Sequence, residues 1–157
     1  MKQNSTKSIK AVSVIIITFC TLSALFVFGQ TYAMYAVPDG MNVKWSDSLK
    51  GFQISIIIGR TVGAAVFFGL ISAFLIKTIK GLESGVLFPA ANVPILYLSA
   101  IFLFVYNFST SNGGIVTGAE EALLIDTDDV LFSLIFVVFA MIYKIAVKVS
   151  EENSLTI

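Results

Sequence analysis

Four long apolar stretches, separated by short polar segments, dominate this sequence. The first has no charged residue between Lys10 and Asp39, and Arg60 is the single charge between Lys50 and Lys77. A helix needs about 20 apolar residues to cross the roughly 30 Å hydrocarbon core of a bilayer. We therefore expect an all-α integral membrane protein, in which residues 1–157 form one bundle of four transmembrane helices. The expected spans are residues 11–37, 52–76, 90–108 and 130–147.

The composition agrees with a membrane protein and excludes several classes of function. Hydrophobic residues make up 57% of the chain and charged residues 13%, against about 25% charged residues in soluble domains. A net charge of zero argues against direct nucleic-acid binding, which needs a basic surface. The absence of histidine excludes histidine-ligated metals and histidine-based catalysis, and the single Cys20 excludes an internal disulfide. We expect neither a cofactor nor a catalytic centre.

The distribution of lysine predicts the orientation in the membrane. With both termini in the cytoplasm, seven lysines lie inside and two lie outside, which agrees with the enrichment of Lys and Arg in cytoplasmic segments. A cleaved signal peptide is the alternative for the first stretch, but its apolar part is longer than that of a usual signal peptide. The inside lysines are Lys2, Lys7, Lys10, Lys77, Lys80, Lys144 and Lys148, and the outside lysines are Lys44 and Lys50.

Arg60 lies within the second stretch, where a charge is costly unless it faces the bundle and finds a partner. We expect a carboxylate partner at the start of the fourth helix, from Asp126, Asp128 or Asp129. A structural ion pair is the favoured interpretation, because no second intramembrane charge marks a pathway. An anion or substrate site and a gating charge are the alternatives.

Ser55, Gly59 and Gly63 recur every four residues and share one face of the second helix. Small residues at this spacing let two helix backbones approach closely. We expect this face to pack against another helix of the same chain, with contacts in a homo-oligomer as the alternative.

The loops carry weaker signals. Asn92 followed by Pro94 predicts the start of the third helix, with Asn92 as its cap. Residues 109–114 are typical of a turn or coil, and residues 119–125 predict a short interfacial helix. The carboxylates that follow do not match a calcium-binding loop, so we expect a solvated acidic face.

Two segments on the expected cytoplasmic side resemble a known family. Residues 85–92, GVLFPAAN, are similar to its Gly-x-x-Phe-x-x-x-Asn stretch, and the ending EENSLTI is similar to its Glu-Glu-Asn-Asp-Leu-Thr-Ile/Val ending, with Ser154 at the usual aspartate position. The family is the bacterial membrane family catalogued as "domain of unknown function 2975". The resemblance implies a four-span protein of the bacterial cytoplasmic (inner) membrane with no assigned activity. Family members are often encoded beside a small helix-turn-helix regulator, which implies a cytoplasmic transcription regulator as partner.

Three functions are compatible with these features to different degrees. The favoured one is a non-enzymatic membrane partner or sensor whose cytoplasmic segments bind such a regulator. The alternative is a small oligomeric transporter or channel with Arg60 near a polar pathway, although transporters usually show repeats and several intramembrane polar groups. An intramembrane enzyme is disfavoured, since the spans hold no paired carboxylates. The residues expected to contact a partner are Phe88, Pro89, Asn92, Glu151, Glu152, Asn153, Leu155 and Ile157.

Overall fold

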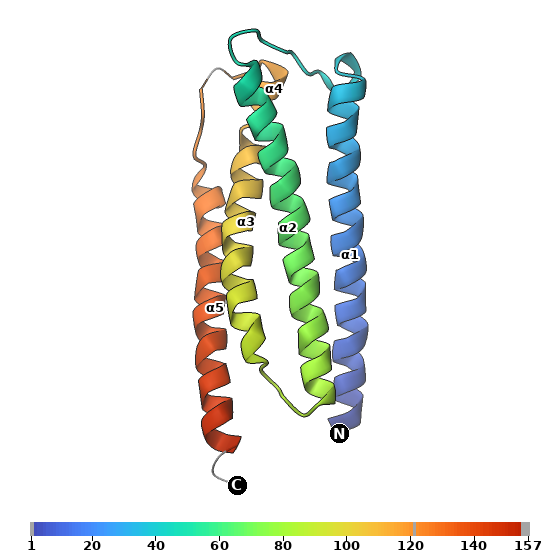
Figure 1. The fold of residues 1–157 in the computed structure, drawn as a ribbon, viewed down its shortest axis with the longest axis vertical. Helices are drawn as coiled ribbons and strands as arrows, with labels where there is room; N and C mark the ends of the chain where they lie inside the picture. The colour runs from blue at the N-terminus through green and yellow to red at the C-terminus, as the bar shows by residue number, and fades with distance from the viewer. Residues whose placement is uncertain (1, 121, 155–157) are drawn as a thin grey trace.

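The computed structural model describes the backbone of residues 2–120 and 122–154, and the side chains of residues 7–120 and 122–153. Within these residues the chain is helical and forms no strand. Four long helices run alternately up and down, in the order α5, α3, α2, α1 across the bundle (Figure 1). The elements are α1 (Lys2–Ala36), η1 (Asp39–Met41), α2 (Lys50–Glu83), η2 (Ala90–Asn92), α3 (Val93–Ser111), α4 (Gly113–Thr117) and α5 (Thr127–Ser154).

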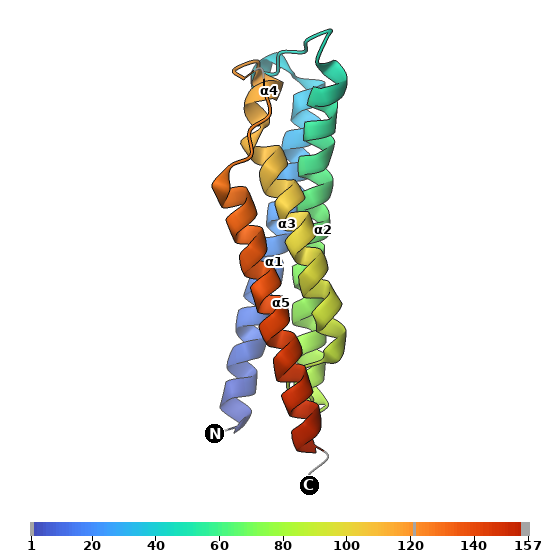
Figure 2. The ribbon, with the colours of Figure 1, turned by 90° about the vertical axis from the view of Figure 1, so that its left-hand side faces the viewer.

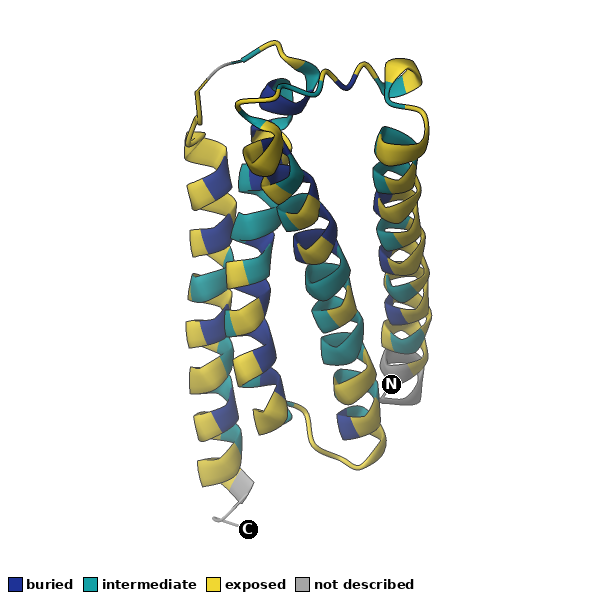
Figure 3. Ribbon diagram, turned by 45° about the horizontal axis from the view of Figure 1, so that its top comes forward, coloured by how far each residue is buried: buried dark blue, intermediate teal, exposed yellow. Residues whose placement is uncertain are grey.

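Four helical segments are long and apolar enough to cross a membrane. A helix satisfies its own backbone hydrogen bonds, as a hydrocarbon environment requires. Large apolar side chains also point away from the bundle: on α1 the exposed fractions are 67% for Ile15, 67% for Phe19 and 75% for Tyr32. Figure 3 shows such exposed positions along the outward faces of the long helices. Apolar surface of this extent is typical of proteins that contact a membrane.

Proline and glycine mark the ends of the helices. α1 ends two residues before Pro38, which has no N–H group to continue a helix. Gly85 follows the end of α2 with a φ of 82°, and the Val86 N–H donates to the Gly81 carbonyl at 2.8 Å. Pro94 lies in the first turn of α3, where a missing N–H group costs no helical hydrogen bond.

α2 and α3 approach each other at two glycines of the small-residue pattern. A methyl group on Gly63 would lie 2.7 Å from the backbone nitrogen of Tyr106. A methyl group on Gly59 would lie 2.5 Å from the Ser109 hydroxyl oxygen. Both distances are too short for a real side chain, so the absence of side chains at these positions permits the close approach.

Ser55 differs from the expectation for that pattern. Its side chain is exposed, and its hydroxyl donates to the Gly51 carbonyl of the same helix at 2.9 Å. The helices are antiparallel, so each turn toward the start of α2 corresponds to one turn toward the end of α3. Ser55 therefore lies beyond Ser111, where α3 has already ended.

A folded cap covers the end of the bundle opposite the two termini (Figure 2). Gln53, at the start of α2, is 1% exposed and joins three segments of this cap. Its side-chain oxygen accepts the Ser46 N–H at 3.1 Å, and its nitrogen donates to the carbonyls of Lys44 at 2.8 Å and Ile115 at 2.9 Å. The buried cluster of the cap consists of Val43, Ile56, Ile57, Ile115 and Val116.

The segment between α3 and α5 differs from its predicted structure. Part of the expected coil at residues 109–114 belongs to α3 and α4, whereas the expected helix at residues 119–125 is absent from the described part of that range. Asn112 explains the difference, because it is fully buried and its amide accepts from and donates to the backbone of Leu124, at 2.8 Å each. These two bonds hold the segment around Leu124 in a non-helical course.

Candidate functional site

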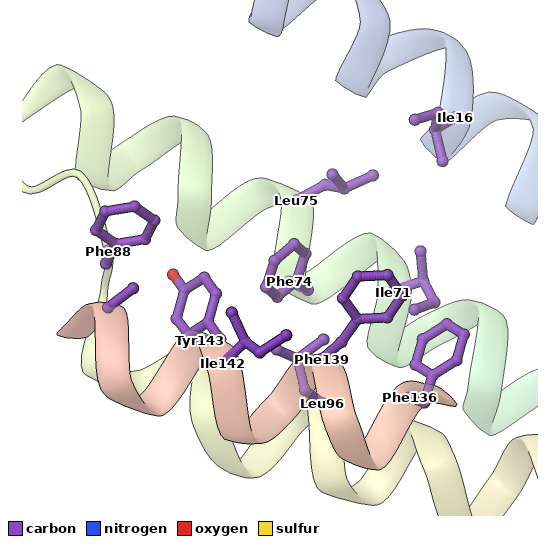
Figure 4. Close-up of a pocket in the computed structure, with 11 residues that line it drawn as sticks. Ile16, Ile71, Phe74, Leu75, Phe88, Leu96, Phe136, Phe139, Ile142 and Tyr143 are labelled. Atoms are coloured by element: carbon purple, nitrogen blue, oxygen red, sulfur yellow. The ribbon is translucent and has the colours of Figure 1, made fainter. Parts of the chain in front are cut away.

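The loop between α2 and α3 folds back against the end of α2, at the end of the bundle where α1 starts and α5 ends (Figure 1). We call this the terminal end. Gly81 permits the fold, since a methyl group there would lie 2.5 Å from Pro89 Cγ and 2.8 Å from the Val86 carbonyl oxygen. The contact positions Phe88 beside residues of both α2 and α5 (Figure 4).

Asn92 fixes the same loop to two helices. Its side-chain nitrogen donates to the Thr78 hydroxyl at 2.9 Å, the Phe74 carbonyl at 3.4 Å and the Tyr143 hydroxyl at 3.2 Å. The residue is fully buried, and its side chain makes no capping bond to α3. Asn92 thus occupies the expected N-cap position of α3 but forms no side-chain cap, because its amide is used inside the bundle. Its burial makes it an internal anchor rather than the exposed contact residue that was expected.

Three aromatic rings form a row at this point. The Tyr143 ring lies between Phe74 of α2, with ring centroids 5.6 Å apart, and Phe88 of the loop, 5.7 Å apart, both in edge-to-face geometry. The Tyr143 hydroxyl also donates to the Pro89 carbonyl at 3.4 Å. Tyr143 thus connects α5 to the loop and to α2.

An apolar groove lies on the side of this row that faces α1. α1 packs on α2 and α5 packs on α3, so the side of the bundle between α1 and α5 is left open. Figure 4 shows Ile16 of α1 across this opening from the aromatic rings of α2 and α5. The groove has a volume of about 390 Å³, and we call it the membrane groove. Its lining is Ile16, Ile71, Phe74, Leu75, Phe88, Leu96, Phe136, Phe139, Ile142, Tyr143 and Ala146.

A second groove of about 440 Å³ lies between the loop and the last turns of α5. We call it the loop groove. Phe88 lines both grooves, together with Ile142 and Ala146. The loop groove brings Phe88 of residues 85–92 together with Asn153 of the C-terminal motif, although 65 positions separate them. Its lining is Leu87, Phe88, Ile142, Ile145, Ala146, Val149, Ser150 and Asn153.

The remaining expected contact residues surround this groove or fall outside the structure. Pro89 is half-buried against Gly81. Glu151 and Glu152 are exposed on the last turns of α5, and Glu152 lies 3.9 Å from the Lys148 ammonium group. Leu155 and Ile157 lie outside the described residues.

Arg60 does not pair with the carboxylates at the start of α5. Its guanidinium donates to the side-chain oxygen of Gln30 on α1, and its Nε is buried without a hydrogen-bond partner among the described residues. The hydroxyls of Thr31 and Thr61 meet beside it at 2.6 Å. The expected ion pair is wrong because Arg60 follows Gly59 by about 100° around the helix, which turns it from α3 toward α1.

The three aspartates lie at the start of α5. Asp129 is 3% exposed and accepts the Ser111 hydroxyl at 2.9 Å, while its second oxygen has no partner among the described residues. Asp126 accepts the Asp128 N–H at 3.3 Å. The Asp129 carboxylate therefore serves the α3–α5 contact, and the Asp126 carboxylate serves the first turn of α5.

A double-mutant cycle tests the assignment of Arg60. For Arg60→Met and Gln30→Leu we expect a coupling free energy of about 1.5–3 kcal/mol, the usual contribution of a hydrogen bond to a charged group. Either single variant already breaks this hydrogen bond, so the double variant loses it only once. The measurement is the unfolding free energy of the four variants in detergent micelles. The control cycle of Arg60→Met with Asp129→Asn is expected to be additive within about 0.5 kcal/mol. A larger coupling with Asp129 than with Gln30 contradicts the assignment.

No family model, curated protein or solved structure matches this chain. The family resemblance at residues 85–92 and 151–157 therefore stays a prediction. The two grooves are lined mainly by apolar side chains. In the described residues, no group of three His, Cys, Asp or Glu side chains could hold a metal ion.

The sequence alone did not single out Tyr143 or Gln30 as residues that form contacts between helices. Both are polar residues within an apolar stretch, and such residues are costly in hydrocarbon unless they are bonded. This was a signal that could have identified them, although their partners depend on how the helices are rotated against each other.

Proposed function

We propose that this chain is a multi-pass protein of the bacterial cytoplasmic membrane that binds a cytoplasmic protein and catalyses no reaction. The loop groove is its binding surface, and apolar side chains of the partner occupy it. The family resemblance suggests a helix-turn-helix transcription regulator as that partner. The chain itself does not contact nucleic acid in this proposal, because its net charge is zero.

The lysine distribution supports an orientation with the terminal end in the cytoplasm. Six lysines with described side chains belong to that end, and three glutamates accompany them. Basic residues are enriched on the cytoplasmic side of membrane proteins. The glutamates are Glu83, Glu151 and Glu152, and the lysines are Lys7, Lys10, Lys77, Lys80, Lys144 and Lys148.

One observation carries the proposed function: the loop groove joins the two segments that resemble family motifs. Residues 85–92 supply Leu87 and Phe88, and α5 supplies an apolar wall that ends at Asn153. Leu87 is 55% exposed and Val149 is 49% exposed, so both are accessible to a partner. Exposed apolar residues around a concave surface are typical of protein interaction sites.

A small oligomeric transporter or channel is the alternative. It requires a polar pathway through the membrane. The membrane groove does not favour this alternative, since the Tyr143 hydroxyl is the one polar side-chain group among its lining residues and already donates to the Pro89 carbonyl.

Crosslinking in cells followed by purification from native membranes tests the proposed function. We expect the full chain to capture a cytoplasmic protein, and a chain ending at Ser150 to bind the purified partner about tenfold more weakly or worse. The double variant Leu87→Gln/Val149→Gln is expected to show a similar loss, because it makes two exposed positions of the groove polar without changing their charge.

Val86→Gln is the matched control, because Val86 is 47% exposed but is absent from the lining of the loop groove. It is expected to bind like the unmodified chain. Binding that is unaffected by both the truncation and the double variant overturns the proposed function, provided that all variants insert into the membrane equally.

A further inference from the structure

Among the described residues, two contacts that involve charged side chains join α1 to α2, and they lie toward opposite ends of the pair. Near the terminal end the Lys10 ammonium group pairs with Glu83 at 2.5 Å, and nearer the cap the Arg60 guanidinium donates to Gln30. The two contacts are separated by 20 positions of α1 and 23 positions of α2, which correspond to about 30 Å and 35 Å along the helices. The hydrocarbon core of a bilayer is roughly 30 Å thick, so the two contacts fit its two boundaries.

Aromatic side chains support the same position for the boundary near the cap. Tyr32 and Tyr35 follow Gln30 on α1 and are exposed, and the Tyr35 ring stacks on Trp45 with centroids 5.7 Å apart. Tyr and Trp are enriched at the level of the lipid headgroups. Arg60 bonds to Gln30, two positions before Tyr32. In this position of the bundle, the Arg60 guanidinium therefore lies where hydrocarbon gives way to headgroups.

The chain does not neutralise the charge of Arg60. In the part of the chain that the structure describes, Arg60 forms no salt bridge, and its hydrogen-bond partner Gln30 is a neutral amide. Its Nε is buried and has no partner among the described residues, although a guanidinium carries five N–H donors. The residue is half-buried, so its side chain is partly accessible from outside the bundle. A charge at membrane depth is costly unless it is paired, which points to an anion from outside the chain.

We propose that Arg60 binds the phosphate group of a phospholipid in the leaflet at the cap end of the bundle. A guanidinium suits a phosphate because its planar fork donates two parallel N–H bonds to phosphate oxygens. Headgroup phosphates lie beside the boundary at which Arg60 is placed. The site involves neither groove and requires no partner protein, so it does not rest on the proposed function.

Thermal unfolding of the full chain in detergent micelles with added lipid tests the site. Phosphatidylglycerol is expected to raise the unfolding temperature as its concentration rises, because a ligand that binds only the folded state stabilises that state. Diacylglycerol with the same acyl chains lacks the phosphate, and inorganic phosphate lacks the acyl chains. Each of these two probes is expected to leave the unfolding temperature unchanged.

Gln30→Glu separates the charge of Arg60 from its role in packing, because the new carboxylate neutralises the guanidinium within the chain. We expect this variant to fold as stably as the unmodified chain and to bind phosphatidylglycerol about tenfold more weakly or worse. Arg60→Met is expected to show the same loss of affinity, and if it fails to fold, Gln30→Glu alone decides. Lys50→Gln is the matched control, since it removes an exposed positive charge ten positions earlier on the same helix. It is expected to bind like the unmodified chain.

Four outcomes overturn the proposed phosphate site. The first is an affinity for phosphatidylglycerol that Gln30→Glu leaves unchanged. The second is an equal loss of affinity in Lys50→Gln, which indicates attraction to the overall positive charge. The third is equal stabilisation by diacylglycerol, which indicates that acyl chains are the ligand, and the fourth is equal stabilisation by inorganic phosphate, which indicates a soluble anion. None of these outcomes bears on the loop groove, because no partner protein is present.

Discussion

Replacing Gly63 by leucine is expected to lower the unfolding free energy by about 3 kcal/mol, because the new side chain has no space between α2 and α3. Its Cβ would lie 2.7 Å from the backbone nitrogen and 2.9 Å from the Cα of Tyr106. Backbone atoms cannot change rotamer, so the two helices must separate. Thermal and denaturant unfolding of the purified protein in detergent micelles measures the effect.

Gly69→Leu is the matched control for this prediction. Gly69 belongs to the same helix, is exposed, and has no atom within 4 Å of an added Cβ. Leucine also has a higher helix propensity than glycine, so this variant is expected to be as stable as the unmodified protein or slightly more stable. Equal destabilisation by the two variants contradicts a specific close approach at Gly63.

Gln53→Leu is expected to destabilise the cap by a similar amount, about 3 kcal/mol, because it removes three side-chain hydrogen bonds of a buried residue. Their partners are the Ser46 N–H and the carbonyls of Lys44 and Ile115. Leucine fills nearly the same volume, so the loss reports on hydrogen bonding rather than on a cavity. Unfolding measures the free energy, and faster proteolysis of residues 38–49 locates the change in the cap.

Ser48→Ala is the control within the same loop. The Ser48 hydroxyl bonds to the Ser46 hydroxyl at 3.0 Å, but the contact is exposed to solvent, so its removal is expected to cost less than about 0.5 kcal/mol. If Gln53→Leu changes stability as little as Ser48→Ala, then Gln53 does not hold the cap together.

The candidate site combines predictable and unpredictable parts. The sequence marked residues 85–92 and the C-terminal motif as one functional unit, and the loop groove contains members of both. It also marked Asn92 as a surface contact, whereas the structure buries it beside Tyr143. A single sequence motif thus contains an exposed residue, Leu87, and a buried anchor, Asn92, and nothing in the order of residues separates the two environments.

The number of apolar helices and the glycines of α2 could be predicted from the sequence. Helices long enough to cross a membrane follow from local physics, because each satisfies its own backbone bonds and needs only enough consecutive apolar residues. Gly59 and Gly63 can also be recognised from local geometry, since residues four positions apart share a helix face.

Only the tertiary structure decided which groups meet. Arg60 bonds to Gln30 rather than to an aspartate, and α5 packs on α3 and leaves the membrane groove open toward α1. These contacts depend on how each helix is rotated about its axis and on the order of the helices in the bundle. A helix that is apolar on nearly every face has no hydrophobic pattern in its sequence from which its rotation or its neighbours could be predicted. The packing of side chains between helices chooses them, as at Gly63 against Tyr106 and at Asn92 against Tyr143.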